Sequence, residues 1–451
     1  MKKINIGDKM KTKLKFIVVP VFCFLLSSRV SAQVKIDSLS LNEAIKMTLA
    51  SSNSLQQASY AVDASLAKVE QSKSSLYPEA NVSLNYTWIG PIPAFSFPGF
   101  GNISLAPDNN WDEHVTVSTT LYDFNKRDKN IEFAKSQVNG FKDKVEFIKQ
   151  DLVYKTVQSF YTIIFLKQSI EVQKDQINTF NKHLEWTKKK FDAGTATDFD
   201  MLTVKVRIAS AENSKISLEN SLANTEIYLR RLLGVGPSTA VNPQGQFTDA
   251  PAKINYDSLI YFAYANRVEI KNAENQKAAA KAMDEVAANI NNPSLMLIFN
   301  YGFKNGYEPN MFVWRGNFAL TAAAQIPVSK FIPFFGGNKE ENMHQEAVAN
   351  MNAADSYKKD MTDQIKAEIQ KAISDIKSSI EKYRTTEASI KQAESALNLA
   401  KIRYDAGSVT NLDLLDAETS LSQAKLMRLE ALYRYMLGIY ELKQAAGEKI
   451  W

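Results

Sequence analysis

Three aspartates near the ends of helical segments are the side chains best placed to do chemistry. Asp413 and Asp416 are three residues apart, so they lie on one face of a helix. Asp200 takes the position of Asp413 in an earlier segment of similar sequence. Carboxylates gathered in one place attract cations, but acids next to a helix N-terminus can equally be solvated surface groups. The residues alone leave both interpretations open.

The residue types that enzymes and metal sites use are sparse. The histidines fall in a predicted strand (His114) and two predicted helices (His183 and His344), without the spacing of metal ligands. The sequence contains neither a phosphate-binding loop nor a Gly-x-Ser-x-Gly motif. His183, close to Glu185, is expected to be a solvated surface residue. We therefore predict no catalytic residue, no cofactor and no metal site, and we expect the protein not to be an enzyme.

The acids belong to a segment that the chain contains twice. Residues 190–202 reappear 213 positions later as residues 403–415. Each copy carries a glycine, Gly194 or Gly407, which permits the left-handed backbone needed to reverse a helix tightly. The repeat therefore predicts two helical hairpins that turn at these glycines.

The residues after each glycine suit the start of a returning helix. That helix can be capped by a threonine or by the polar residue that follows it, and the candidates are Thr197 or Asp198 and Thr410 or Asn411. The two tips are expected at 192–200 and 405–413.

The similarity extends along the whole chain. Tyr77-Pro78 matches Asn292-Pro293 and Leu233-Gly234 matches Ala446-Gly447, at offsets of 215 and 213 residues. Internal repetition over this length determines the architecture. We predict one body with a first repeat at 33–240, a linker rich in Pro, Gly and Asn at 241–253, and a second repeat at 254–451.

The first 32 residues have the character of a secretory signal. A lysine-rich start precedes the apolar stretch Phe16–Leu26, and Val30-Ser31-Ala32 is a small-residue cleavage site. This segment holds 7 of the 54 basic residues and 1 of the 49 acidic ones, so the remaining chain is nearly neutral and gives no reason to expect a nucleic-acid partner. Its Cys23 is the only cysteine, so we expect neither disulfides nor cysteine-based metal sites.

Long helical stretches dominate both halves. Residues 126–192 and 338–405 lack proline, and as a helix the first would span about 100 Å. Apolar residues recur along them at spacings of three and four, which is typical of coiled-coil packing: Val138, Phe141, Val145, Ile148 and Leu152, then Ile365, Ile369, Ile373, Ile376 and Ile380. Helices are also predicted within 41–76, and one shorter helix each at about 198–233, 257–291 and 410–447. Helices of this length must pack side by side, within this chain or with other chains.

Each half also contains a predicted β-hairpin, at about 80–122 and 294–326, and no further strands are evident. Apolar and polar residues alternate in the strands, in the dyad pattern of an outer-membrane barrel, although a half-buried strand of a soluble sandwich shows the same alternation. The apolar positions include Val82, Leu84, Tyr86, Trp88, Trp314, Phe318 and Leu320. Four strands cannot close a barrel, and open edges in lipid leave backbone groups unpaired. Several chains must therefore share one barrel if these strands contact the lipid bilayer.

The chain resembles the TolC-type outer-membrane efflux proteins over nearly its whole length after the signal. The resemblance is carried by the duplicated pattern aromatic-x-x-Gly-x-x-Ser/Thr-x-x-Asp-x-Leu, which runs here from Phe191 to Leu202 and from Tyr404 to Leu415. Gly336-Gly337-Asn338-Lys339 after the second strand pair also matches. The resemblance implies a mainly α fold with a membrane β part: a homotrimer with a 12-stranded barrel in the outer membrane and a long helical coiled-coil barrel in the periplasm.

The resemblance also implies a function and partners. The chain would be a passive exit duct for drugs or polypeptides, served by a periplasmic adaptor and an inner-membrane pump of the RND or ABC type. The adaptor would dock at the tips, at Ala193, Gly194, Thr195, Ala406, Gly407 and Ser408. The family's inner constriction would be formed by Asp413, Asp416, Tyr404 and Asp200. Val409 stands where the best-known member has an arginine, so we expect that arginine's ionic lock to be absent.

Other classes explain less of the sequence. A secreted coiled-coil structural or adhesin-like protein would account for the helices but not for the alternating hairpins. A periplasmic adaptor would need a lipoyl-like β domain, and the sequence shows no such cluster of strands.

Overall fold

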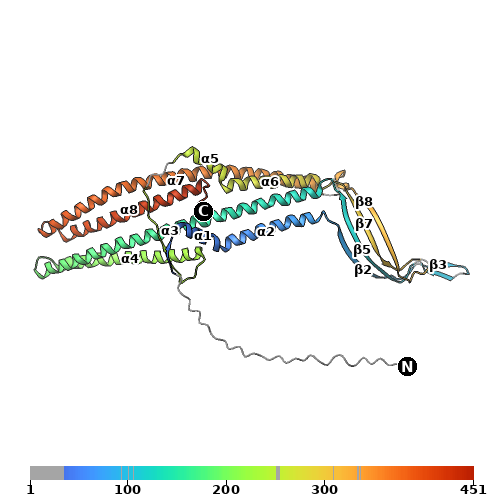
Figure 1. Cartoon of the computed structure of the whole chain (residues 1–451), viewed down its shortest axis with the longest axis horizontal. Coiled ribbons are helices and arrows are strands. Elements are labelled where there is room, and N and C mark those ends of the chain that lie inside the picture. The colour runs from blue at the N-terminus through green and yellow to red at the C-terminus, as the bar shows by residue number, and fades with distance from the viewer. Residues whose placement is uncertain are drawn as a thin grey trace, which may run out of the picture.

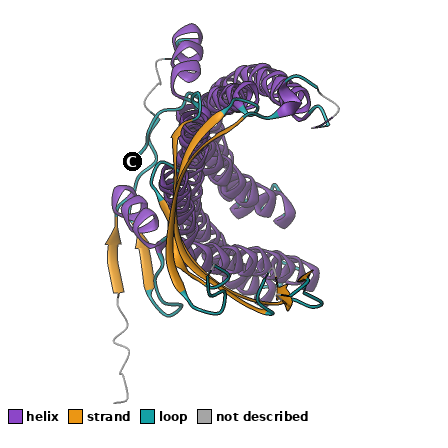
Figure 2. Cartoon of the chain, turned by 90° about the vertical axis from the view of Figure 1, so that its right-hand side faces the viewer, coloured by secondary structure: helices purple, strands orange, loops and turns teal. Residues whose placement is uncertain are grey.

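The computed structural model describes residues 35–451, except residues 93, 100, 105, 250–253, 308, 333, 334 and 336. The predicted signal segment lies outside the described residues. The chain is elongated, with a β-sheet at one end and the tips of two helical hairpins at the other (Figure 1). Viewed along this long axis, helices and sheet form a curved wall with one concave side (Figure 2).

Each half follows the order expected from the repeat. The first half contains β1 (Lys35–Leu39), α1 (Leu41–Ser51), α2 (Asn53–Ser74), β2 (Glu79–Trp88), β3 (Ala94–Phe97), β4 (Gly101–Ser104), β5 (Asn109–Tyr122), α3 (Lys126–Asp192) and α4 (Asp198–Leu233). The second contains β6 (Ala240–Pro243), α5 (Tyr256–Asn266), α6 (Val268–Asn289), β7 (Ser294–Lys304), β8 (Arg315–Gln325), the short 3-10 helix η1 (Val328–Lys330), α7 (Lys339–Asp405) and α8 (Asn411–Ala445). The mainly α fold with a β part and internal duplication is confirmed.

The helices predicted within 41–76 are α1 and α2, whereas the single helix predicted at 257–291 is broken into α5 and α6. Ser52 ends α1 and caps α2, its hydroxyl oxygen accepting a hydrogen bond from the N–H of Leu55 at 3.2 Å. Arg267 separates α5 from α6 with extended backbone. Its guanidinium forms ion pairs with Glu269 and Glu368, each at 3.0 Å, which hold this bend in place.

The two predicted β-hairpins join into one antiparallel sheet with the order β2-β5-β7-β8. The register aligns Val82 with Val115, Val115 with Tyr301, and Tyr301 with Phe318, so one apolar row crosses all four strands. Polar residues predominate on the other face, which also carries Met296 and Ile298. There the hydroxyl of Thr116 donates to Oδ1 of Asn300 at 2.6 Å. Alternation in each strand thus builds one apolar and one polar face of a single sheet.

Short strands outside this sheet were not predicted. β1 pairs in parallel with β6, and β3 pairs with β4 in a hairpin within the loop between β2 and β5. β6 also begins inside the expected first repeat and extends into the expected linker. The expectation of no further strands was therefore wrong, although each added sheet has only two strands.

Helix packing forms the core in separate clusters along the molecule. One cluster brings α1, α3 and α4 together with β6, and includes Ile45, Val157, Phe160, Leu229 and Val241. A second joins α5, α6, α7 and α8 and contains the predicted α7 seam, with Ile365, Ile369 and Ile376 buried. Each such buried side chain stabilises the fold by about 2 kcal/mol. The predicted α3 seam is only partly covered, because Val138 is buried whereas Phe141 is 37% exposed.

Among the described residues, no helix has both the length and the apolar content needed to cross a membrane.

Candidate functional site

The two helical hairpins reverse at the predicted glycines. Gly194 has a φ of +73° and Gly407 a φ of +72°, both in the left-handed region. The N–H of Thr195 donates to the carbonyl oxygen of Lys190 at 2.8 Å, and that of Ser408 to Arg403 at 2.9 Å. These six-to-one bonds satisfy carbonyl groups that the helix end leaves free. The six residues predicted for docking, Ala193, Gly194, Thr195, Ala406, Gly407 and Ser408, are exposed at these turns.

The returning helices are capped by the threonines. Thr410 accepts a hydrogen bond from the N–H of Asp413 at 3.2 Å, and the Asp413 carboxylate accepts from the Thr410 N–H at 2.8 Å. Thr197 and Asp200 form the same capping box on α4. The hydrogen bonds from the Thr410 hydroxyl and then its backbone hold the pKa of the Asp413 carboxyl below its usual value. Asp413 and Asp200 therefore occupy equivalent positions in the first turns of the two returning helices.

Asp416 connects the two hairpins. Its carboxylate lies 2.9 Å from the guanidinium of Arg207 on α4, and the two side chains are 58% and 38% exposed. The sequence indicated that an ionic lock would be missing, because Val409 replaces the family's arginine. The structure provides an ion pair from a different position, and Val409 instead packs against the apolar cluster of Leu397, Tyr404 and Leu414. Arg207 and Asp416 are 209 residues apart, so no local pattern marks them as partners.

Tyr404 faces α8. Its side chain is buried, and its hydroxyl lies 3.5 Å from Oδ1 of Asn411. Burial raises the pKa of this hydroxyl. Lys190 of α3 donates to the Tyr404 carbonyl oxygen at 2.8 Å and places its ammonium 3.9 Å from the ring centre. Tyr404 is therefore held between the two hairpins.

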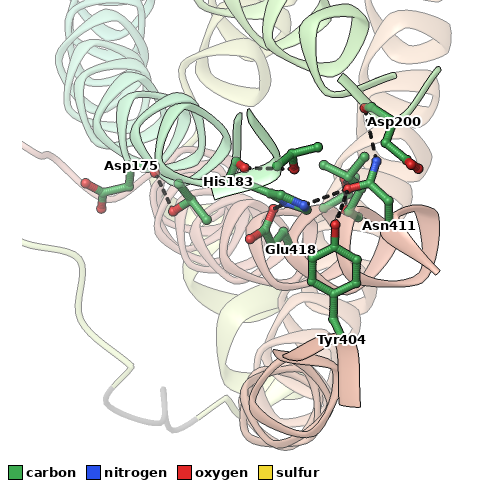
Figure 3. A network of polar contacts seen from close by, with 10 residues as sticks. Asp175, His183, Asp200, Tyr404, Asn411 and Glu418 are labelled. Carbon is green, nitrogen blue, oxygen red and sulfur yellow. Dashed lines mark hydrogen bonds and ion pairs between the residues drawn. The ribbon is translucent and has the colours of Figure 1, made fainter. Parts of the chain in front are cut away.

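Asn411 links two of the predicted gate residues, Asp200 and Tyr404. Its amide nitrogen donates to the Asp200 carbonyl oxygen at 3.2 Å, while its side-chain oxygen faces both Tyr404 and His183 (Figure 3). Asp200 and Tyr404 thus meet through Asn411. Asp413 and Asp416 lie outside this network. Asp413 belongs to the cap of α8 and Asp416 pairs with Arg207.

His183 is buried, which contradicts the prediction of a solvated surface residue. It lies between α3 and α8, 3% exposed, with Nδ1 3.1 Å from Glu418 and Nε2 2.8 Å from Asn411 (Figure 3). The neighbouring Lys182 and Glu185 gave a polar local context. The partners of His183 are 228 and 235 residues away along the chain, so local sequence did not reveal them.

The predicted membrane-strand residues share the apolar face of the sheet. The side chains of Val82, Leu84, Trp88, Phe318 and Leu320 are each more than 60% exposed in the single chain, and those of Tyr86 and Trp314 about half exposed. An exposed apolar face of this extent is typical of a surface that contacts lipid or another protein. In the part of the chain that the structure describes, no three His, Cys, Asp or Glu side chains converge as metal ligands.

Comparison with known proteins agrees with this arrangement. A family model described as "Outer membrane efflux protein" matches residues 44–235 and 259–448. The outer membrane protein TolC of Vibrio cholerae is 23% identical over 85% of this chain and 85% of its own length. The alkaline protease secretion protein AprF of Pseudomonas aeruginosa is 23% identical over 75% of this chain and 71% of its own. The crystal structure of VceC from Vibrio cholerae matches with a TM-score of 0.75 at 20% identity, over 91% of this chain and 97% of VceC.

The family match covers most of the chain and falls once in each half, as an internally duplicated protein requires. The VceC structure shares the same fold of long helices and a β part. The chain therefore belongs to the outer membrane efflux protein family and is an outer-membrane exit duct for efflux or type I secretion.

Proposed function

We propose that three copies of this chain assemble into the duct. An uncovered stripe on α4 supports the proposal, because its residues recur at spacings of three and four and are all exposed in the single chain: Phe199, Leu202, Val206, Ala209, Asn213, Ile216, Asn220, Ala223 and Ile227. This is the spacing of a coiled-coil seam, which requires a second helix. The neighbouring copy would supply that helix.

The sheet supports the same assembly. Within the described residues β2 pairs only with β5 and β8 only with β7, so each has one free edge. Open edges are unfavourable in lipid, where no water replaces the missing backbone partners. Pairing β8 of one copy with β2 of the next would give a closed barrel of 12 strands, with the apolar face toward lipid.

The duct would be the passive outer part of a larger export system. Both turns lie at the end of the molecule opposite the sheet, which suits contact with a periplasmic adaptor (Figure 1). An inner-membrane pump of the RND or ABC type would supply the energy, and the duct itself would catalyse no reaction. The cargo would be drugs or polypeptides, and AprF is named for the secretion of a polypeptide.

A carboxylate gate at the inner end completes the proposal. The observation that carries it is the contact between Asp416 on α8 and Arg207 on α4, because it joins the two hairpins close to their tips. In a trimer Asp413 and Asp416 would each form a ring of three carboxylates, which favours cations. Tyr404 and Asp200 would hold the ring in place through Asn411.

Planar bilayer recordings test the gate. Asp416→Ala should raise the single-channel conductance several-fold, because an exposed ion pair contributes up to about 1 kcal/mol and each trimer loses three. Glu430→Ala is the matched control, since it removes an acid whose partner, Arg434, is on the same helix. Unchanged conductance and cation preference in Asp416→Ala would remove Asp416 from the gate.

A further inference from the structure

A buried polar contact joins the two helical hairpins just behind the proposed gate. The side chains of His183 on α3 and Glu418 on α8 are only 1% and 4% exposed, and Nδ1 lies 3.1 Å from the carboxylate. Nε2 lies 2.8 Å from Oδ1 of Asn411, which is also on α8. We call His183, Asn411 and Glu418 the tether.

The partners of Asn411 determine which of its atoms faces the histidine. Its amide nitrogen donates to the Asp200 carbonyl oxygen at 3.2 Å, and its oxygen lies 3.5 Å from the Tyr404 hydroxyl, which can donate. The reverse orientation would place two acceptors together at Asp200. The oxygen of Asn411 therefore faces His183, and Nε2 must carry a proton to donate to it.

Counting donors then shows that the tether holds an additional proton. A neutral imidazole with its proton on Nε2 has a lone pair on Nδ1, which would face an ionised Glu418 without a proton between them. Either Nδ1 or the Glu418 carboxyl must therefore be protonated for a hydrogen bond to form at 3.1 Å. Without that proton, two acceptors on nearly fully buried side chains face each other, which is unfavourable.

The tether lies next to the gate acids along α8. Asn411 and Glu418 are one heptad apart on α8, and Asp413 and Asp416 lie between them. His183 belongs to the other hairpin. Each hairpin is a pair of packed helices, so a change of width at the inner end requires one hairpin to move relative to the other. Such a movement would have to separate His183 from α8.

We propose that the additional proton fastens α8 to α3 and keeps the duct narrow, and that removal of the proton in alkaline solution releases the gate. The inference rests on the proposed gate and adds its regulation. The established family function does not require it, because a duct can close without any group that titrates.

Other charged groups lie near the tether but do not supply its additional proton. Beside it is a groove of about 470 Å³, whose lining includes Lys182 of α3 and Lys401 and Asp405 of α7. The Tyr404 ring of α7 lies 5.8 Å from the imidazole ring, and α4 contributes the Asp200 carbonyl group through Asn411. Among the described residues, Glu418 is the carboxylate that contacts the imidazole nitrogen.

The decisive variant is Glu418→Gln, recorded as the full trimeric protein in planar bilayers from about pH 6 to about pH 9. The wild-type open probability should rise about tenfold with pH, the shift expected on losing one charge-assisted hydrogen bond. In Glu418→Gln the side-chain amide donates to a neutral His183 without an additional proton. Its open probability should therefore stay low across the range. A merely structural role of Glu418 would not change the shape of the pH profile.

Two further variants complete the design. His183→Leu removes both contacts and should give a high open probability at every pH, provided that the variant is still recovered as a trimer. His344→Gln is the matched control, because His344 is an exposed histidine paired with Asp284. That hydrogen bond raises the pKa of His344, so its ion pair is also lost as pH rises, but far from the tips. This control should keep the wild-type profile.

The outcomes distinguish a failure of the proposed tether from a failure of the proposed gate. A wild-type profile in Glu418→Gln, or a flat profile in the wild type, would overturn the tether. If Asp416→Ala still raises the conductance in that case, the proposed gate stands without the tether. If Asp416→Ala leaves the conductance unchanged and His183→Leu leaves the open probability unchanged, the gate and the tether fail together.

Discussion

Single residues determine how the hairpins turn and how they are joined. Gly194 and Gly407 could be predicted from sequence, because a helix that reverses within a few residues needs a left-handed position that glycine adopts without strain. The roles of Arg207 and His183 could not be predicted. Their partners are more than 200 residues away, and burial of a histidine depends on which helices pack around it.

The turn glycines give a prediction at this scale. Gly407→Ala should destabilise the second hairpin by about 1 kcal/mol, because alanine must adopt a φ of +72° there, while nothing lies within 4 Å of the added carbon. Gly140→Ala is the control, since Gly140 lies inside α3 with the same free space. Alanine there should stabilise by about 0.5 to 1 kcal/mol. Thermal unfolding followed by circular dichroism checks both, and equal shifts of the same sign would contradict the backbone explanation.

Whole helices and strands were predictable to different degrees. The bounds of α3 followed from a long stretch without proline, ended by the glycine turn. The break at Arg267 was missed because one of the ion-pair partners that hold it, Glu368 on α7, is about 100 residues away along the chain. β1 and β6 were missed because each is short and its partner is about 200 residues away. Alternation identified the four long strands, but not the pairing of β5 with β7.

The two faces of β8 give a prediction for the sheet. Leu320 lies on the apolar face beside Phe299, and the next residue, Thr321, lies on the polar face. Leu320→Arg should cost about 2 to 4 kcal/mol if its face contacts the middle of the bilayer, whereas Thr321→Arg should cost little. Recovery of folded protein from outer-membrane fractions, followed by heat-modified mobility, measures the difference. Equal recovery of the two variants would show that this face does not contact lipid.

At the scale of the molecule, one chain forms only part of a closed structure. The curved wall leaves an apolar face of the sheet, two strand edges and the α4 stripe uncovered. The need for further copies could be predicted from sequence, because four alternating strands cannot close in lipid. The number of copies could not, since it depends on the curvature that the packed helices and strands adopt together.

The mass of the assembly is therefore the most direct test of the account. The chain without its signal segment, extracted from outer membranes in detergent, would be examined by native mass spectrometry as the detergent is removed. We predict a complex of three chains that stays in solution only with detergent. A single chain that remains dissolved without detergent would contradict the shared barrel, and with it the proposed gate and tether.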